Sequence, residues 1–287
     1  MKELLVHVLA PSRAKLFITY AAYIARDLGL AVRYMQVLAP ANFPLSMPGS
    51  ISATGKVTQQ DLDRETEKSE HHFKVQTDNL LASEPELPNL EYQVETGHPP
   101  DVISEYGRDE RVSAVMLSGS TGSALFSDDS SNVEIIRKVK CPVWIIPEGI
   151  TYRPFSEILY ATDYHEEDLP NLRQLTKLAS RFPASITAVH ITRDANFDEK
   201  AKGKGFAEMI KQETGYEMVS IKVLPETKGE PLVDELHKFA LMVDADLVVL
   251  LRENRGFFDR LRHGSRSEKI ARETQLPVLI FNEERKK

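Results

Sequence analysis

The sequence predicts an α/β protein made of two tandem copies of a five-stranded parallel, doubly wound (Rossmann-like) sheet flanked by helices. Three observations lead to this prediction. The same order of strand-like and helix-like segments occurs twice along the chain. The inner strand candidates are almost continuously apolar, as strands covered on both faces are. The length of 287 residues suits two domains of ordinary size.

The early segments of the two halves match in order. In the first half, an apolar run at 4–9 precedes a helix-spaced stretch at 16–28, which Gly29 closes, and a second strand at 31–37 follows. The corresponding segments of the second half are 158–162, 172–179 and 185–191. Each half then has a polar stretch, at 40–58 and at 193–205. Strands that alternate with helices predict parallel pairing through right-handed crossovers.

The later segments repeat as well. The apolar run at 112–117 matches the run at 245–250, and the closing strands are 142–147 and 277–281. A short connection at 149–154 joins the copies, so we expect the first domain to span residues 1–149 and the second 150–287.

Composition narrows the classes of function. The formal net charge of −7 disfavours nucleic acid as a partner, because an acidic surface repels phosphate backbones. The single cysteine, Cys141, excludes an intramolecular disulfide and fits a reducing cytosol. The first residues do not resemble a signal peptide, and no apolar run approaches the length of a membrane span. We therefore expect a soluble, cytoplasmic protein.

Glycine- and serine-containing loops follow the fourth strand of each copy, at the sheet edge where parallel α/β proteins bind ligands. Glycines let the backbone approach phosphate oxygens, and a helix N-terminus attracts anions. Taken singly, each loop is also compatible with an ordinary turn and a serine N-cap. The candidate residues are Gly119, Gly122 and Ser130 in the first copy and Arg252, Gly256, Gly264, Ser265 and Arg266 in the second.

The order of strand, Gly-x-x-Gly loop, Gly-Ser helix start and Cys-Pro-Val strand resembles the universal stress protein family, twice over essentially the whole chain. The resemblance implies an adenine nucleotide, ATP or AMP, held by the loop glycines and serine. It also implies that an Asp at the end of the first strand and a backbone position of the second strand hold the adenosine. In the second copy these positions are Asp163 and Val189.

Both copies depart from the family's nucleotide motif. Leu9 takes the place of the first-strand Asp in the first copy, where Asp129 also replaces a motif glycine. In the second copy Glu253 replaces the first motif glycine, while Asp163 has an alternative interpretation as a turn residue. We therefore expect nucleotide binding mainly in the second domain.

Two functions from different classes follow. The first is a ligand-sensing stress-response protein that binds an adenine nucleotide, with at most slow ATP hydrolysis because no general base is evident. The second is a structural or partner-binding module of the same family without nucleotide. No histidine has metal-ligand spacing with the cysteine or a second histidine, so we expect no metal.

The closing strands suggest how the halves associate. Both are strongly apolar sheet edges, and exposed edges are usually paired or covered. The family resemblance implies pairing through this strand, here within one chain. The alternative is that the halves meet elsewhere and a further chain, as in a homodimer, covers the edges.

Overall fold

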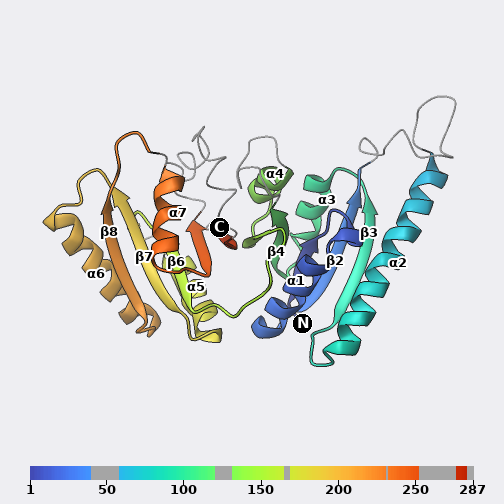
Figure 1. Ribbon diagram of the computed structural model, residues 1–287, viewed down its shortest axis with the longest axis horizontal. Coiled ribbons are helices and arrows are strands. Elements are labelled where there is room, and N and C mark those ends of the chain that lie inside the picture. Colours follow the sequence, from blue (N-terminus) through green and yellow to red (C-terminus); the bar gives the residue numbers. More distant parts are fainter. Residues whose placement is uncertain (40–57, 120–130, 165–168, 231, 252–275, 283–287) are drawn as a thin grey trace. The chain divides into compact units, whose positions relative to one another are not determined.

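The computed structural model describes residues 1–39, 58–119, 131–164, 169–230, 232–251 and 276–282 (Figure 1). The chain divides into two compact units. Unit 1 comprises Met1–Ser118, Ser131–Cys141 and Gly149–Tyr152, and unit 2 comprises Gly119–Ser130, Pro142–Glu148 and Arg153–Lys287. Each unit is an α/β fold with a mostly parallel sheet, which confirms the predicted fold class. The domain boundary at 149/150 stays a prediction.

The strands of unit 1 lie in the order β3-β2-β1-β4 and are all parallel. Every residue of β1 is buried, and β2 and β4 are buried at all but one and two positions, respectively, because helices cover both faces. The strands are β1 (Glu3–His7), β2 (Ala31–Leu38), β3 (Leu90–Thr96) and β4 (Val112–Gly119).

The helices of unit 1 begin and end at recognisable signals. Gly29 ends the first α-helix in the left-handed conformation, with φ of 70°. Thr58 and Asp61 form a capping box at the start of the second. The helices are η1 (Pro11–Arg13), α1 (Lys15–Leu28), α2 (Gln59–Ser83), α3 (Pro99–Tyr106) and α4 (Ser131–Lys138).

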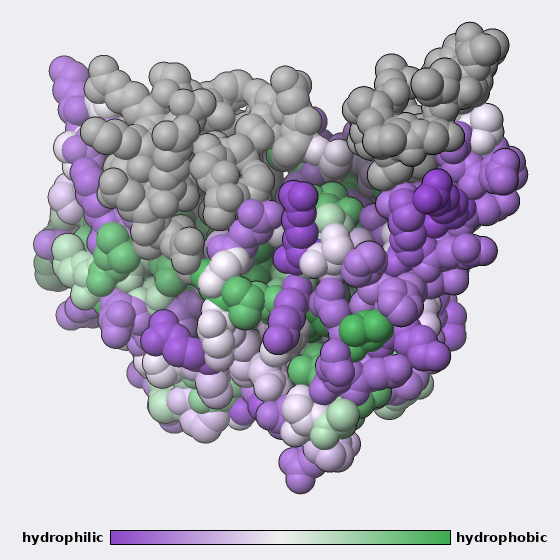
Figure 2. Space-filling model, turned by 45° about the vertical axis from the view of Figure 1, so that its right-hand side comes forward, coloured by the Kyte–Doolittle hydropathy of each residue, from purple (hydrophilic) through white to green (hydrophobic). Residues whose placement is uncertain are grey.

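An aromatic stack attaches α2 to the sheet. Phe73 is fully buried, and its ring stacks on Tyr34 of β2 and Tyr92 of β3, with centroids 6.2 and 5.7 Å away. Ser69 and Thr77 are the other buried residues of this helix. The outward surface of α2 is hydrophilic (Figure 2). A long charged helix is thus held by one narrow buried stripe.

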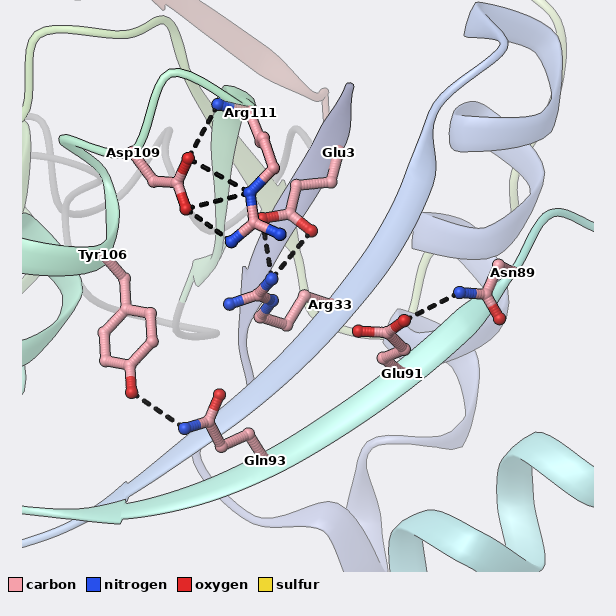
Figure 3. Close-up of polar contacts among 8 residues, drawn as sticks. All are labelled: Glu3, Arg33, Asn89, Glu91, Gln93, Tyr106, Asp109 and Arg111. Atoms are coloured by element: carbon pink, nitrogen blue, oxygen red, sulfur yellow. Dashed lines mark hydrogen bonds and ion pairs between the residues drawn. The ribbon is translucent and has the colours of Figure 1, made fainter. Parts of the chain in front are cut away.

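Polar side chains lie on the opposite face of β2 and β3, because successive residues of a strand alternate sides. Arg33 lies 3.1 Å from both carboxylate oxygens of Glu3, and both side chains are nearly buried (Figure 3). Tyr106 of α3 donates a hydrogen bond of 2.6 Å to Glu95 and accepts one from Gln93. The contacts of Tyr106 tie α3 to β3, the outer strand of unit 1.

The strands of unit 2 lie in the order β5-β10-β9-β6-β7-β8. The pairs from β10 to β8 are parallel and repeat the order of unit 1, whereas β5 pairs with β10 antiparallel. The strands are β5 (Val143–Pro147), β6 (Glu157–Ala161), β7 (Ser185–Thr192), β8 (Val219–Pro225), β9 (Leu247–Leu251) and β10 (Val278–Phe281). The two closing strands are therefore hydrogen-bonded neighbours, as predicted.

The helices of unit 2 include one that the polar stretch at 193–205 did not predict. Asn196 caps it by accepting a hydrogen bond of 3.0 Å from the Glu199 N–H, and Gly215 ends it with φ of 68°. Its buried stripe is too narrow to show as a strong periodic signal, which explains why the sequence analysis missed it. The helices are α5 (Leu169–Arg181), α6 (Phe197–Thr214) and α7 (Leu232–Met242). Among the described helices, none has the length and apolarity to cross a bilayer.

A buried histidine makes unit 1 sensitive to acid. His7 is 2% exposed and lies beside Met35 and Leu117 in the neighbouring strands. Burial lowers the pKa of His7 to about 4. The unfolded chain takes up this proton below its ordinary pKa of about 6.5, so the stability of unit 1 falls as the pH drops from there towards 4.

We predict that His7→Leu removes the fall in the stability of unit 1 at acid pH. Relative to the variant, wild type should lose about 2 kcal/mol of unfolding free energy between about pH 7 and about pH 5. Urea unfolding at both pH values measures the difference. His72→Gln on the exposed side of α2 is the control and should behave as wild type. A stability difference between wild type and His7→Leu that does not change with pH would contradict the prediction.

Candidate functional site

Three consecutive residues at the carboxyl end of β6 meet the end of β7 in unit 2. The Thr162 N–H donates a hydrogen bond of 3.0 Å to the Val189 carbonyl, which continues the β6–β7 ladder past Ala161. The next residue of β7, His190, therefore turns its ring towards the chain that leaves β6. Its Nδ1 lies 2.9 Å from the Thr162 carbonyl and 3.5 Å from Oδ1 of Asp163.

Helix α6 adds a second carboxylate to this edge. Oε2 of Glu199, in the first turn of α6, lies 3.8 Å from Nε2 of His190. Oε1 of the same carboxylate accepts a hydrogen bond of 2.7 Å from Lys202. The Lys202 ammonium, followed by the charge of His190, holds the pKa of Glu199 below its usual range. The imidazole thus lies between the carboxylates of Asp163 and Glu199.

Tyr164 covers the imidazole from one side. Its backbone has φ of 64°, which is uncommon for a residue with a side chain, and its N–H donates to Oγ1 of Thr162 at 3.0 Å. Its ring lies 4.3 Å from that of His190 and 5.2 Å from that of Phe206 in α6. Burial, with the charges of Glu199 and Asp163, raises the pKa of the Tyr164 hydroxyl. We call Asp163, Tyr164, His190 and Glu199 the edge cluster.

Two opposing influences set the pKa of His190. Burial of the ring, whose side chain is 13% exposed, lowers the pKa by disfavouring the charged form. The Asp163 carboxylate, the Thr162 carbonyl and the charge of Glu199 raise it, and together they outweigh burial. The pKa of His190 is therefore above its ordinary value of 6.5.

The same backbone position in unit 1 has different chemistry. The Val8 N–H donates to the Met35 carbonyl at 2.8 Å, as Thr162 does to Val189. Leu9 then occupies the place of Asp163 and is 60% exposed. Nε2 of Gln36, at the register position of His190, donates a hydrogen bond of 3.1 Å to the Leu9 carbonyl. An uncharged pair in unit 1 therefore replaces the charged pair of unit 2.

The structure describes three of the residues that the sequence analysis selected. Asp163 lies at the edge as expected, and Val189 beside it is buried with its carbonyl in the ladder. Gly119 is the buried last residue of β4, where the Asn132 side chain donates to the Ser118 carbonyl at 2.9 Å. The remaining candidates lie outside the described residues: Gly122, Ser130, Arg252, Gly256, Gly264, Ser265 and Arg266.

The other three members of the edge cluster were not selected from the sequence. His190 follows Val189 directly, so its position beside Asp163 could have been found by aligning the two copies strand by strand. No local pattern pointed to Tyr164 or Glu199. Tyr164 depends on an unusual backbone conformation, and Glu199 on a helix that the sequence did not predict.

A second group of titratable side chains lies in unit 1, where α3 meets α4. One ligand atom each of His98, Asp101 and Glu134 lies within 4.8 Å of the others. Nζ of Lys138, however, lies 2.6 Å from each of the two carboxylates. A lysine ammonium already supplies the positive charge there, so we interpret this group as an ion-pair network that joins two helices.

Comparison with known proteins gives one family. The model of the universal stress protein family matches residues 1–147 and again residues 154–282. Among curated proteins, no relative matches the chain.

Two solved structures with TM-scores above 0.5 show the same fold. A universal stress protein from Archaeoglobus fulgidus DSM 4304 is 16% identical, with 98% of this chain and 96% of that chain covered and a TM-score of 0.70. The cytoplasmic domain of a prokaryotic cation chloride cotransporter is 13% identical over 99% of this chain and 97% of that one, with a TM-score of 0.53. A universal stress protein from Archaeoglobus fulgidus in complex with dAMP is 20% identical over 45% of this chain and 100% of that one, with a TM-score of 0.34.

A glycine of α6 makes room for the edge cluster. A Cβ at Gly203 would lie 2.9 Å from the Tyr164 hydroxyl oxygen and 3.1 Å from Cγ2 of Val223 in β8. At Gly205, on the same helix, a Cβ would meet nothing within 4 Å. The two glycines therefore provide a matched pair for testing how tightly α6 packs on Tyr164.

We predict that Gly203→Ala lowers the unfolding free energy of unit 2 by about 1–3 kcal/mol through overpacking. Gly205→Ala should instead raise it by about 0.5–1 kcal/mol, because alanine favours the helix. Adding Tyr164→Phe to Gly203→Ala should recover part of the loss. Thermal or urea unfolding measures all three, and equal stability of the two alanine variants would contradict the packing of Tyr164 against Gly203.

Proposed function

Because this chain belongs to the universal stress protein family, we propose that it is a stress-response protein that binds an adenine nucleotide, AMP or ATP, at the carboxyl edge of unit 2. The observation that carries the proposal is the Asp163 carboxylate. It follows β6 directly, at the first-strand position that the family resemblance assigns to the nucleoside. Its side chain is 24% exposed, so part of the carboxylate is open to a ligand.

The topology of unit 2 supports this location. The chain runs from β6 through α5 to β7 on one side, whereas β9 pairs with β6 on the other. The strand order therefore reverses between β6 and β9, and α/β proteins bind ligands in the crevice at such a reversal. Asp163 follows β6 at this point of reversal. The glycines and arginines selected from the sequence follow β9 along the chain, at residues 252–266, outside the described residues.

The chemistry of a carboxylate at this point suits a nucleoside. An ionised carboxylate only accepts hydrogen bonds, and ribose hydroxyl and adenine amino groups can donate them. His190 contacts one oxygen of Asp163 and leaves acceptor sites of the carboxylate available. The negative charge of Asp163 also requires that positive groups, such as the arginines after β9, receive the phosphate.

The residues of unit 1 favour the other candidate function, a structural or partner-binding module without nucleotide, for that unit. Leu9 supplies no acceptor side chain where unit 2 has Asp163, and 60% of Leu9 is exposed. We propose that the nucleotide occupies unit 2 and that unit 1 serves as a structural or partner-binding module. If the wild-type protein does not bind nucleotide, we infer that the whole chain is a structural or partner-binding module.

We predict that Asp163→Ala weakens AMP binding by roughly tenfold to a hundredfold, because each hydrogen bond to a charged group contributes about 1.5–3 kcal/mol. Titration calorimetry with AMP and with ATP measures the change. Asp198→Ala, which removes an exposed carboxylate in the first turn of α6, is the charge-matched control and should bind as wild type. Equal affinity of wild type and Asp163→Ala would remove the site from this edge.

A further inference from the structure

We propose that ligand binding at the edge cluster is linked to the uptake of one proton by His190, so that an anionic ligand binds more tightly as the pH falls. The inference rests on the proposed function, because the ligand is the nucleotide placed there. It adds a form of regulation that the nucleotide motif does not describe, because it depends on His190 and Glu199, which are not motif residues.

The hydrogen bond to Thr162 fixes the neutral form of the ring. A carbonyl oxygen can only accept, so Nδ1 of His190, at 2.9 Å, must carry the proton. In neutral imidazole the other nitrogen then has a lone pair. That lone pair on Nε2 faces Oε2 of Glu199 at 3.8 Å, so two acceptors oppose each other. A second proton on Nε2 turns this opposition into an ion pair.

The charges around the ring favour that proton. Asp163 faces Nδ1 from the end of β6, and Glu199 faces Nε2 from α6. Lys202 is the opposing cation, but it is bound to the other oxygen of Glu199. From β8, the residue opposite His190 in the ladder is Val223, which has no charge. Tyr164, whose ring contacts the imidazole at an angle of 37°, stays neutral because its pKa is raised. The raised pKa of His190 agrees with this balance.

Protonation changes the site in two ways that favour an anion. The imidazolium can pair with Glu199 in the first turn of α6 and with Asp163 after β6, which holds these elements together at the edge. It also adds a positive charge next to Asp163, which offsets the repulsion between that carboxylate and a phosphate. By thermodynamic linkage, bound nucleotide must in turn raise the pKa of His190. One added charge near a partly exposed site should change the affinity by roughly threefold to tenfold.

A residue of unit 1 suggests the substitution that tests the role of the proton on His190. Gln36 has the register position of His190 and donates to a backbone carbonyl in the same region of its own unit. In His190→Gln, a glutamine can keep the bond to the Thr162 carbonyl but cannot titrate. The variant therefore separates the structural role of the side chain from its charge.

The experiment measures the AMP dissociation constant of wild type and of His190→Gln by calorimetry between about pH 8.5 and about pH 6, the range in which histidine titrates. The phosphate of AMP itself gains a proton near pH 6, so the quantity compared is the ratio of the two constants at each pH. As the pH falls, we expect the affinity of wild type for AMP to rise threefold to tenfold relative to the affinity of the variant. Imidazole NMR should show the pKa of His190 rising when AMP is added.

Two further variants test the assignment. Glu199→Gln keeps the size of the side chain but removes the charge that raises the pKa of His190. The pH at which the affinity for AMP rises should therefore be lower than in wild type. His98→Gln removes the histidine that lies between two carboxylates in unit 1, and it should behave as wild type. If both proteins bind AMP and the ratio of their dissociation constants does not change with pH, this inference is wrong, whereas the proposed function is not affected. If wild type does not bind AMP at any pH, both the proposed function and this inference are wrong.

Discussion

The parallel pairing of β6 with β7 on one side and β9 on the other is the constraint on which unit 2 depends. Parallel strands end at the same edge, so the residues that leave β6 and β7 are brought together by backbone hydrogen bonds alone. The bond from Thr162 to the Val189 carbonyl extends that pairing by one residue. It sets the turn at which Asp163 leaves the sheet and places the His190 ring beside it. The edge cluster is therefore a product of strand register, and a one-residue slip would remove it.

The two units show how much chemistry can change on one backbone. Their ladders match residue by residue up to the strand ends, where Leu9 and Gln36 correspond to Asp163 and His190. No change in strand order accompanies these substitutions. The scaffold thus tolerates a charged, titratable edge in one unit and an uncharged one in the other. A fold shared with a cotransporter domain and with a universal stress protein fits the same view, because function resides in the residues placed on the scaffold.

Much of the fold could be predicted because its signals are local and occur twice. Apolar runs and helix spacing located the strands, and the position of Asp163 followed from where β6 ends. The start of α6 was missed, because a capped helix with one narrow buried stripe looks like a polar stretch in sequence. The contacts of Tyr164 and Glu199 were missed for a related reason. They depend on a left-handed backbone residue and on how close Gly203 lets α6 approach, which no periodic pattern records.

The antiparallel pairing of β5 with β10 has a consequence for synthesis on the ribosome. Val143–Pro147 is made well before its partner Val278–Phe281, because four strands and three helices lie between them along the chain. Until then one edge of β5, an apolar strand, has no β10 to pair with, and such edges in incomplete chains recruit other strands. The sheet of unit 2 can therefore be completed only after the ribosome has made β10. A nascent chain stalled before β10 would be a substrate for chaperones, even with every other strand already in place.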